Sequence, residues 1–100
     1  MSVYMSMRID VDPQKFQEVA SGNLELMRSI TDRAKSEGCI HHRWAAQDGQ
    51  VVVIDEWESP EAFQRFFEGE EKIAQLMQDA GVSSRPQPEF WKPVEVGDEF

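Results

Sequence analysis

Reactive side chains are concentrated in one short segment of the chain, Cys39–Gln50 (CIHHRWAAQDGQ). It holds the only cysteine of the sequence, both histidines, an arginine and a tryptophan. Thiol and imidazole groups bind zinc, and they also act as nucleophiles and general bases. The segment is therefore a metal site, a catalytic group, or a strand that merely carries these side chains.

The pairing of two strands decides which of these side chains can act together. Asp48 and Gly49 are typical of a two-residue β-hairpin turn, which predicts strands over 39–47 and 50–57. Successive side chains of a strand point to opposite faces. One face is predicted to carry Ile40, His42, Trp44 and Ala46, opposite Trp57, Asp55, Val53 and Val51. The other face is predicted to carry Cys39, His41, Arg43 and Ala45, with Glu56, Ile54 and Val52 opposite the last three. The two histidines therefore point in opposite directions.

The first of these faces is bulkier and more apolar, and we expect the helices to cover it. On this face His42 lies opposite Asp55, between Trp44 and Trp57. A carboxylate beside an imidazole fixes its tautomer and raises its basicity, as a general base requires. His42 and Asp55 are therefore the candidate catalytic residues. The alternative is a structural polar pair at the end of the core.

The second face places His41 opposite Glu56, with Arg43 one diagonal step away. We expect these three residues to form interface ion pairs in a homodimer, where such pairs fix the register of two surfaces. An anion-binding patch inside the dimer is the alternative.

A metal site is not expected in the hairpin. Cys39 and His41 share a predicted face, but zinc requires three or four ligands and the sequence has no second cysteine and no third histidine. We expect Cys39 to be a buried structural residue.

Two amphipathic helical segments are expected outside the hairpin. Asp12 and Ser59 are each followed by proline, which is typical of a helix N-cap and first helical residue. The first helix is expected to end at Gly38 and the second at Gly81. Internal breaks are expected at Ser21–Asn23 and at Glu68–Glu71.

Apolar and mostly polar residues alternate over Val3–Ile9, which predicts a first strand. A last strand is expected over Phe90–Val96, and Pro93 indicates that part of it is an edge strand. The order β-α-β-β-α-β predicts a ferredoxin-like α+β domain over residues 1–100, with two helices on one face of a four-stranded antiparallel sheet. The uncovered face favours packing against a second copy, so a homodimer is expected.

Composition narrows the class of protein. With 40% hydrophobic and 29% charged residues, the 100-residue chain is typical of a globular domain. Its net charge of −9 disfavours binding to nucleic acid or an anionic membrane. Neither a signal peptide nor an apolar run of about 20 residues is seen, which predicts a cytoplasmic protein.

The segment Gly38–Phe67 (GCIHHRWAAQDGQVVVIDEWESPEAFQRFF) resembles the antibiotic-biosynthesis-monooxygenase-like family of the dimeric α/β-barrel superfamily. Its most characteristic piece is a strand ending in Glu-Trp followed by Glu-Ser-Pro-Glu-Ala-Phe, here Glu56–Phe63. The resemblance implies a homodimer whose sheets pack face to face, with a small-molecule pocket between sheet and helices in each subunit.

The resemblance also implies an activity. Some members of this family oxidise polycyclic aromatic substrates with molecular oxygen and without metal or flavin, because the substrate carbanion itself reduces oxygen. In that scheme His42 and Asp55 would deprotonate a planar aromatic or phenolic ligand. The pocket wall would consist of Trp44, Trp57, Phe63, Phe66 and Phe67.

Other members degrade heme with a tryptophan and a histidine, but the matching positions here are Phe66 and Leu76, so heme degradation is not expected. A non-catalytic binding or structural homodimer is the remaining alternative. The environment of His42 separates it from an enzyme, because a general base must open into a cavity.

Overall fold

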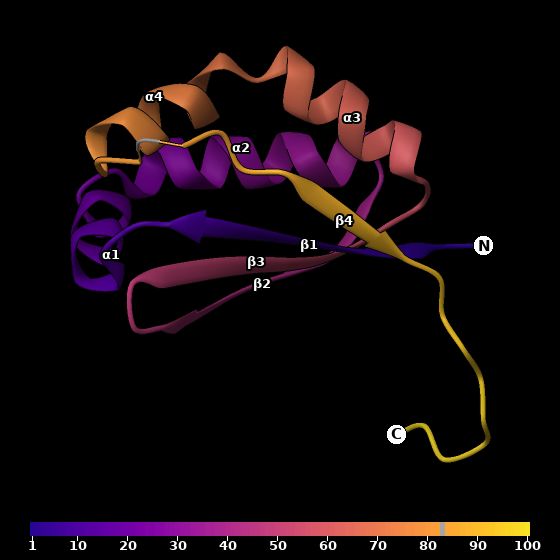
Figure 1. The fold of residues 1–100 in the computed structure, drawn as a ribbon. Coiled ribbons are helices and arrows are strands. Elements are labelled where there is room, and N and C mark those ends of the chain that lie inside the picture. Colours follow the sequence, from indigo (N-terminus) through magenta and orange to yellow (C-terminus); the bar gives the residue numbers. More distant parts are fainter. Residues whose placement is uncertain (83) are drawn as a thin grey trace.

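The protein was described from a computed structural model, which covers residues 1–82 and 84–100. An antiparallel sheet has the strand order β2-β3-β1-β4, and the helices of the described chain lie on one face of it (Figure 1). The elements in chain order are β1 (Val3–Asp10), α1 (Pro13–Ser21), α2 (Leu24–Glu37), β2 (Cys39–Gln47), β3 (Gln50–Trp57), α3 (Pro60–Gly69), α4 (Glu71–Asp79) and β4 (Pro88–Trp91). The predicted ferredoxin-like α+β fold is confirmed.

Each of the two predicted helices is broken where a break was expected. The first divides into α1 and α2 at Gly22–Asn23, and the second into α3 and α4 at Glu70. The Glu70 side chain caps α4 by accepting from the backbone N–H of Lys72 at 3.3 Å. Arg33 of α2 donates to the carbonyl oxygen of Gly69 at 2.8 Å and to Glu70 Oε2 at 3.1 Å. This arginine therefore ties α2 to the junction between α3 and α4.

The β2–β3 hairpin has the predicted two-residue turn, but its far end differs from the prediction. Gln47 pairs with Gln50, and His42 pairs with Asp55, as the turn requires. Beyond His41 the register shifts, because Ile40 forms a β-bulge. Cys39, and not Ile40, therefore lies opposite Trp57. The prediction that Cys39 shares a face with His41 is wrong for the same reason.

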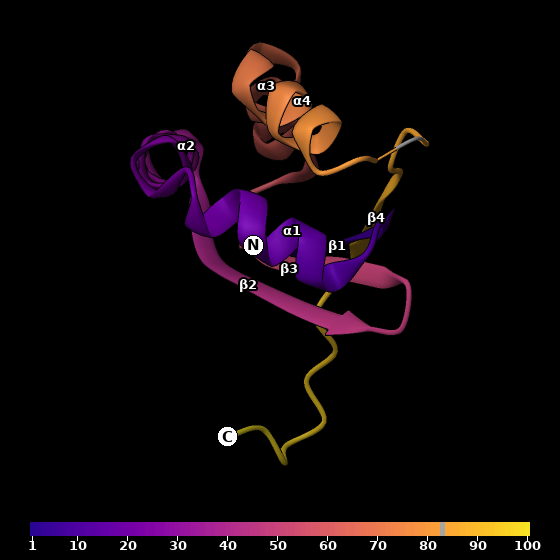
Figure 2. The same cartoon turned by 90° about the vertical axis from the view of Figure 1, so that its left-hand side faces the viewer.

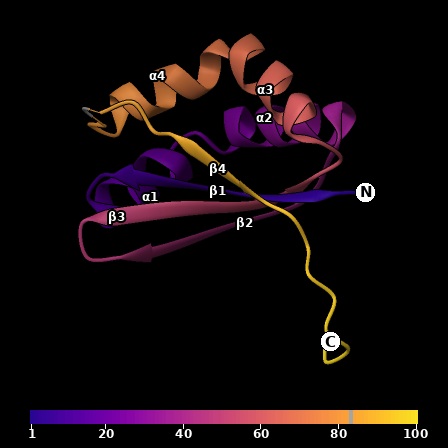
Figure 3. The same cartoon turned by 45° about the vertical axis from the view of Figure 1, so that its right-hand side comes forward.

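The last strand was also placed incorrectly from the sequence. It covers Pro88–Trp91 instead of 90–96. Trp91 pairs with Tyr4, close to the start of β1, so a longer β4 would have almost no partner strand. After Trp91 the chain leads away from the sheet (Figure 3).

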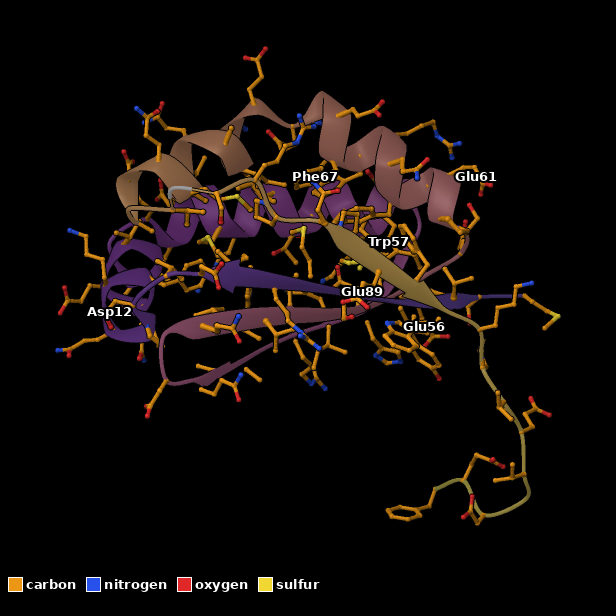
Figure 4. All side chains as sticks on the ribbon, viewed as in Figure 1. Asp12, Glu56, Trp57, Glu61, Phe67 and Glu89 are labelled. Atoms are coloured by element: carbon orange, nitrogen blue, oxygen red, sulfur yellow. The ribbon has the colours of Figure 1, made fainter. Side chains whose placement is uncertain are left out.

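The two faces of the sheet differ as predicted. The covered face of the sheet and α3 together form the hydrophobic core. The buried residues of this core include Met5, Met7, Val53, Trp57, Phe63 and Phe66. Figure 4 shows Trp57 between the sheet and α3, and Glu56 on the opposite side of the sheet. The open face leaves Tyr4, Ile54 and Trp91 about half exposed, at 43%, 45% and 54%. Among the described helices, none has the length and apolar character to cross a bilayer.

The cap of α3 gives a test of this fold, because α3 carries the aromatic core. The Ser59 hydroxyl oxygen accepts from the backbone N–H of Ala62 at 3.1 Å. Ser59→Ala should lower the free energy of unfolding by about 1 kcal/mol, measured by urea denaturation. Ser29→Ala is the matched control, since Ser29 lies inside α2 and its hydroxyl donates only to the Leu26 carbonyl. Equal losses in both variants would contradict the assigned cap.

Candidate active-site cavity

A cavity of about 140 Å³ lies between the covered face of the sheet and the helices. Its lining is mostly apolar and includes Met5 of β1, Val53 of β3, Ala34 of α2, Phe63 and Phe66 of α3, and Met77 of α4. An apolar protein cavity of about 150 Å³ is large enough to bind benzene. The cavity therefore has the size and lining suited to at least one aromatic ring.

His42 and Asp55 face each other in this cavity, on the neighbouring strands β2 and β3. His42 Nδ1 lies 2.7 Å from Asp55 Oδ1, and the indole N–H of Trp57 donates to Asp55 Oδ2 at 3.0 Å. The Asp55 side chain is 6% exposed, so both of its oxygens are satisfied by protein donors away from water. The sequence thus identified this pair, although the bond from Trp57 was not expected.

The hydrogen bond to Asp55 determines the state of the histidine ring. An ionised carboxylate can only accept, so the ring proton shared with it must be on Nδ1. In the neutral imidazole Nε2 then carries the free lone pair, as a general base needs. The His42 side chain is 33% exposed and meets the Trp44 ring edge-on at a centroid distance of 5.3 Å. The arrangement can accept a proton at Nε2 and stabilise the resulting imidazolium through Asp55.

Aromatic rings surround this pair, and all five predicted wall residues line the cavity: Trp44, Trp57, Phe63, Phe66 and Phe67. Trp57 contacts Phe63 and Phe66 with centroid distances of 5.4 Å, and Phe67 stacks on Phe63 at 5.3 Å. Such tilted and offset contacts are the favoured geometries between aromatic rings.

Sequence reasoning missed several lining residues. Phe16 of α1 contacts Trp44 with the two rings tilted and a centroid distance of 4.9 Å, and a row on α2 formed by Met27, Thr31 and Lys35 borders the cavity. The spacing of four residues in this row is a visible signal. It was not recognised because Lys35 and Thr31 are polar and the apolar stripe of the helix runs beside them.

Of the three residues predicted for a dimer interface, Arg43 and Glu56 lie outside the cavity lining, whereas His41 is part of it. His41 pairs with Glu56 across the strands, and Arg43 pairs with Ile54. Within the described protomer His41, Arg43 and Glu56 form no ion pair with one another. Instead, the Ser2 hydroxyl donates to the Glu56 carboxylate, and Arg43 donates to the His42 carbonyl at 3.1 Å. Over the described residues, no three potential metal ligands come together.

Cys39 borders the cavity because of the bulge at Ile40, and it is partly buried instead of fully buried as expected. Burial, and then the negative charge of Asp55, raise its pKa from 9.0 to about 12. The Sγ also contacts the His41 carbonyl oxygen at 3.3 Å, as a protonated thiol can. Since the thiolate is the nucleophile and the metal ligand, Cys39 is unsuited to either role near neutral pH.

The raised pKa predicts slow alkylation of Cys39. At pH 8 iodoacetamide should modify the native protein at least roughly tenfold more slowly than the protein unfolded in urea, because far less thiolate is present. The native rate should keep rising with pH above 9, since the folded thiol ionises only near 12. Mass spectrometry of the modified fraction gives both rates, and equal rates in the two states would contradict the raised pKa of the thiol.

The fold is shared with several solved structures. A monooxygenase from the gene ActVA-Orf6 of Streptomyces coelicolor, solved in complex with Nanaomycin D, superposes with a TM-score of 0.67 and 19% identity over 95% of this chain and 89% of that chain. A variant of SnoaB, a cofactor-independent oxygenase from Streptomyces nogalater, gives 0.65 and 18% over 98% of each chain. A dimeric ferredoxin-like protein from an uncultured marine organism gives 0.66 and 14%, covering 99% of this chain and 93% of that one. At these identities the likeness shows the fold.

The sequence itself establishes the family. No protein with a curated description matches the chain. The family model for antibiotic biosynthesis monooxygenase matches residues 2–74, which include the His42–Asp55 pair and the Glu56–Phe63 motif. Because this match covers most of the chain, the protein belongs to the antibiotic biosynthesis monooxygenase family.

Proposed function

We propose that the protein is a cofactor-independent monooxygenase that oxidises a planar aromatic or phenolic molecule in the cavity between sheet and helices. The observation that carries the proposal is the His42–Asp55–Trp57 chain of hydrogen bonds at the wall of a mostly apolar cavity. It is the geometry of a general base whose proton acceptor, Nε2, is left free. Family membership supports the same chemistry.

The first step is a proton transfer. His42 Nε2 removes a proton from an acidic C–H or O–H of the bound ring system, and Asp55 stabilises the imidazolium that forms. For an anthrone, the acidic group is the methylene between two aromatic rings. Its anion is delocalised over the rings, so a cavity walled by Trp57 and Phe66 can hold it without a dedicated counter-charge.

The second step is the reduction of oxygen by the substrate anion. A C–O bond forms between the carbanion and molecular oxygen, and the imidazolium returns its proton to the resulting peroxide. Loss of water then converts the former methylene into a carbonyl group. One oxygen atom enters the product and the other leaves as water, so the substrate supplies all four electrons. The protein contributes the base and an apolar site that excludes water from the anion.

Oxygen consumption with anthrone tests this assignment. His42→Ala should lower the rate on the order of 10²-fold or more, because general base catalysis is removed. Arg43→Ala is the control on the same strand, since Arg43 pairs with Ile54 on the open face and does not line the cavity, and it should retain most of the activity. An unchanged rate in His42→Ala would remove His42 from the mechanism. No oxidation by the wild type would favour the non-catalytic binding dimer.

We further propose that the open face of the sheet packs against a second copy. Tyr4, Ile54 and Trp91 are large apolar side chains that one protomer leaves half exposed on a flat surface. A stable interface buries about 800 Å² on each partner, and the open face of the sheet is the surface of the protomer that the helices leave uncovered. His41, Arg43 and Glu56 would pair across this interface, since their charges are not matched to each other within the protomer.

A charge placed at the centre of the open face should disrupt the dimer. Ile54→Asp puts an unpaired carboxylate into the proposed interface, so light scattering after gel filtration should show a monomer where the wild type shows a dimer. Leu24→Asp is the control, because Leu24 is 57% exposed on α2, away from this face. A wild-type monomer, or an Ile54→Asp dimer as stable as the control, would contradict the proposed interface.

A further inference from the structure

The cavity opens between α2 and the edge strand β2. Figure 2 shows α2 above β2 along this side of the molecule. Lining residues on this side reach solvent: Trp44 of β2 is 38% exposed, Ile40 is 47% exposed, and Lys35 of α2 is exposed. Lining residues on β1 and β3, such as Met5 and Val53, are buried. A ligand would therefore enter with its apolar part against the sheet interior and its polar part beside Lys35 and His42.

Most polar groups of the cavity already have partners. The Thr31 hydroxyl donates to the Met27 carbonyl at 2.9 Å, and the Cys39 thiol contacts the His41 carbonyl. Both oxygens of Asp55 are used by His42 and Trp57. At the mouth, the Nε2 atom of His42, the ring of His41 and the ammonium of Lys35 remain available to a ligand. For Lys35 the described residues offer no ion pair.

The positive charge of Lys35 acts on a residue of the cavity wall. Burial and the charge of Asp55 raise the pKa of Cys39, and the ammonium of Lys35 opposes them by favouring the thiolate. Cys39 lies on the covered face of β2, on the same side of the sheet as His42. Lys35 is thus on the rim of the cavity, and its flexible four-carbon stem allows its ammonium to reach a bound ligand.

We propose that Lys35 is a specificity-determining residue that selects planar aromatic ligands carrying a carboxylate. The inference rests on the proposed function, because it assumes that the rings occupy the apolar cavity. The whole chain has a net charge of −9, which repels an anionic ligand. A single cation at the mouth of an apolar cavity reverses that repulsion locally. The ligand's rings would fill the interior, its carboxylate would contact Lys35, and its acidic proton would face His42.

Calorimetric binding of two probes of similar shape tests the role of Lys35 without any reaction. The probes are 2-naphthoate, which carries a carboxylate, and 2-naphthamide, which is neutral. Lys35→Gln should weaken naphthoate binding about five- to tenfold and change naphthamide binding less than twofold. Added salt should weaken naphthoate binding to the wild type and leave the variant nearly unaffected. Lys72→Gln is the matched control, because it removes the same charge from α4 outside the cavity lining.

The outcomes separate the inference from the proposed function. Equal losses for the two probes, or no loss for naphthoate, would overturn the role of Lys35 while leaving an aromatic-binding cavity in place. A loss of naphthoate affinity in Lys72→Gln as large as in Lys35→Gln would also overturn it, because the effect would then follow net charge alone. If neither probe binds the wild type, both the proposed function and the inference are wrong. Circular dichroism of each variant confirms that it is folded.

Discussion

The carboxylate of Asp55 is the constraint on which the site depends. A buried carboxylate without partners costs several kcal/mol, so its two oxygens must find donors inside the protein. His42 supplies one and Trp57 supplies the other, at 2.7 and 3.0 Å. Satisfying Asp55 therefore fixes the direction of the His42 ring, the tautomer that leaves Nε2 free, and the position of the largest ring in the core. A strand register shifted by one residue would turn His42 to the other face and leave the carboxylate unpaired.

The helices give this pair an apolar setting that still has an opening. The breaks at Gly22–Asn23 and at Glu70 let the helical segments change direction, so that α3 and α4 arch over the sheet and α1 lies at one end of it (Figure 1). Arg33 holds the second break by binding Gly69 and Glu70, and it also lies over the Phe66 ring at 5.7 Å. The cavity beneath is thus bounded by fixed aromatic side chains, with access from the side of α2 and β2.

The sequence predicted the features that depend on local rules. Asp48-Gly49 sets the hairpin register, so the pairing of His42 with Asp55 followed from counting outward from the turn. The bulge at Ile40 could not be predicted by counting residues from the turn, because no glycine or proline at that position signals it. It arises where the chain leaves α2 at Gly38 and packs Cys39 against the core. Lys35 was missed as a lining residue because its row on α2, although regularly spaced, includes two polar residues and lies beside the apolar stripe of the helix.

A crystal structure with a non-oxidisable flat aromatic ligand tests the central claim most directly. The account predicts that the rings fill the cavity beside Phe63 and Phe66, with a ligand oxygen within hydrogen-bonding distance of His42 Nε2. In that complex His42 Nδ1 should remain bonded to Asp55. A ligand bound elsewhere on the protein, or a His42 ring turned away from Asp55 in the complex, would contradict the account.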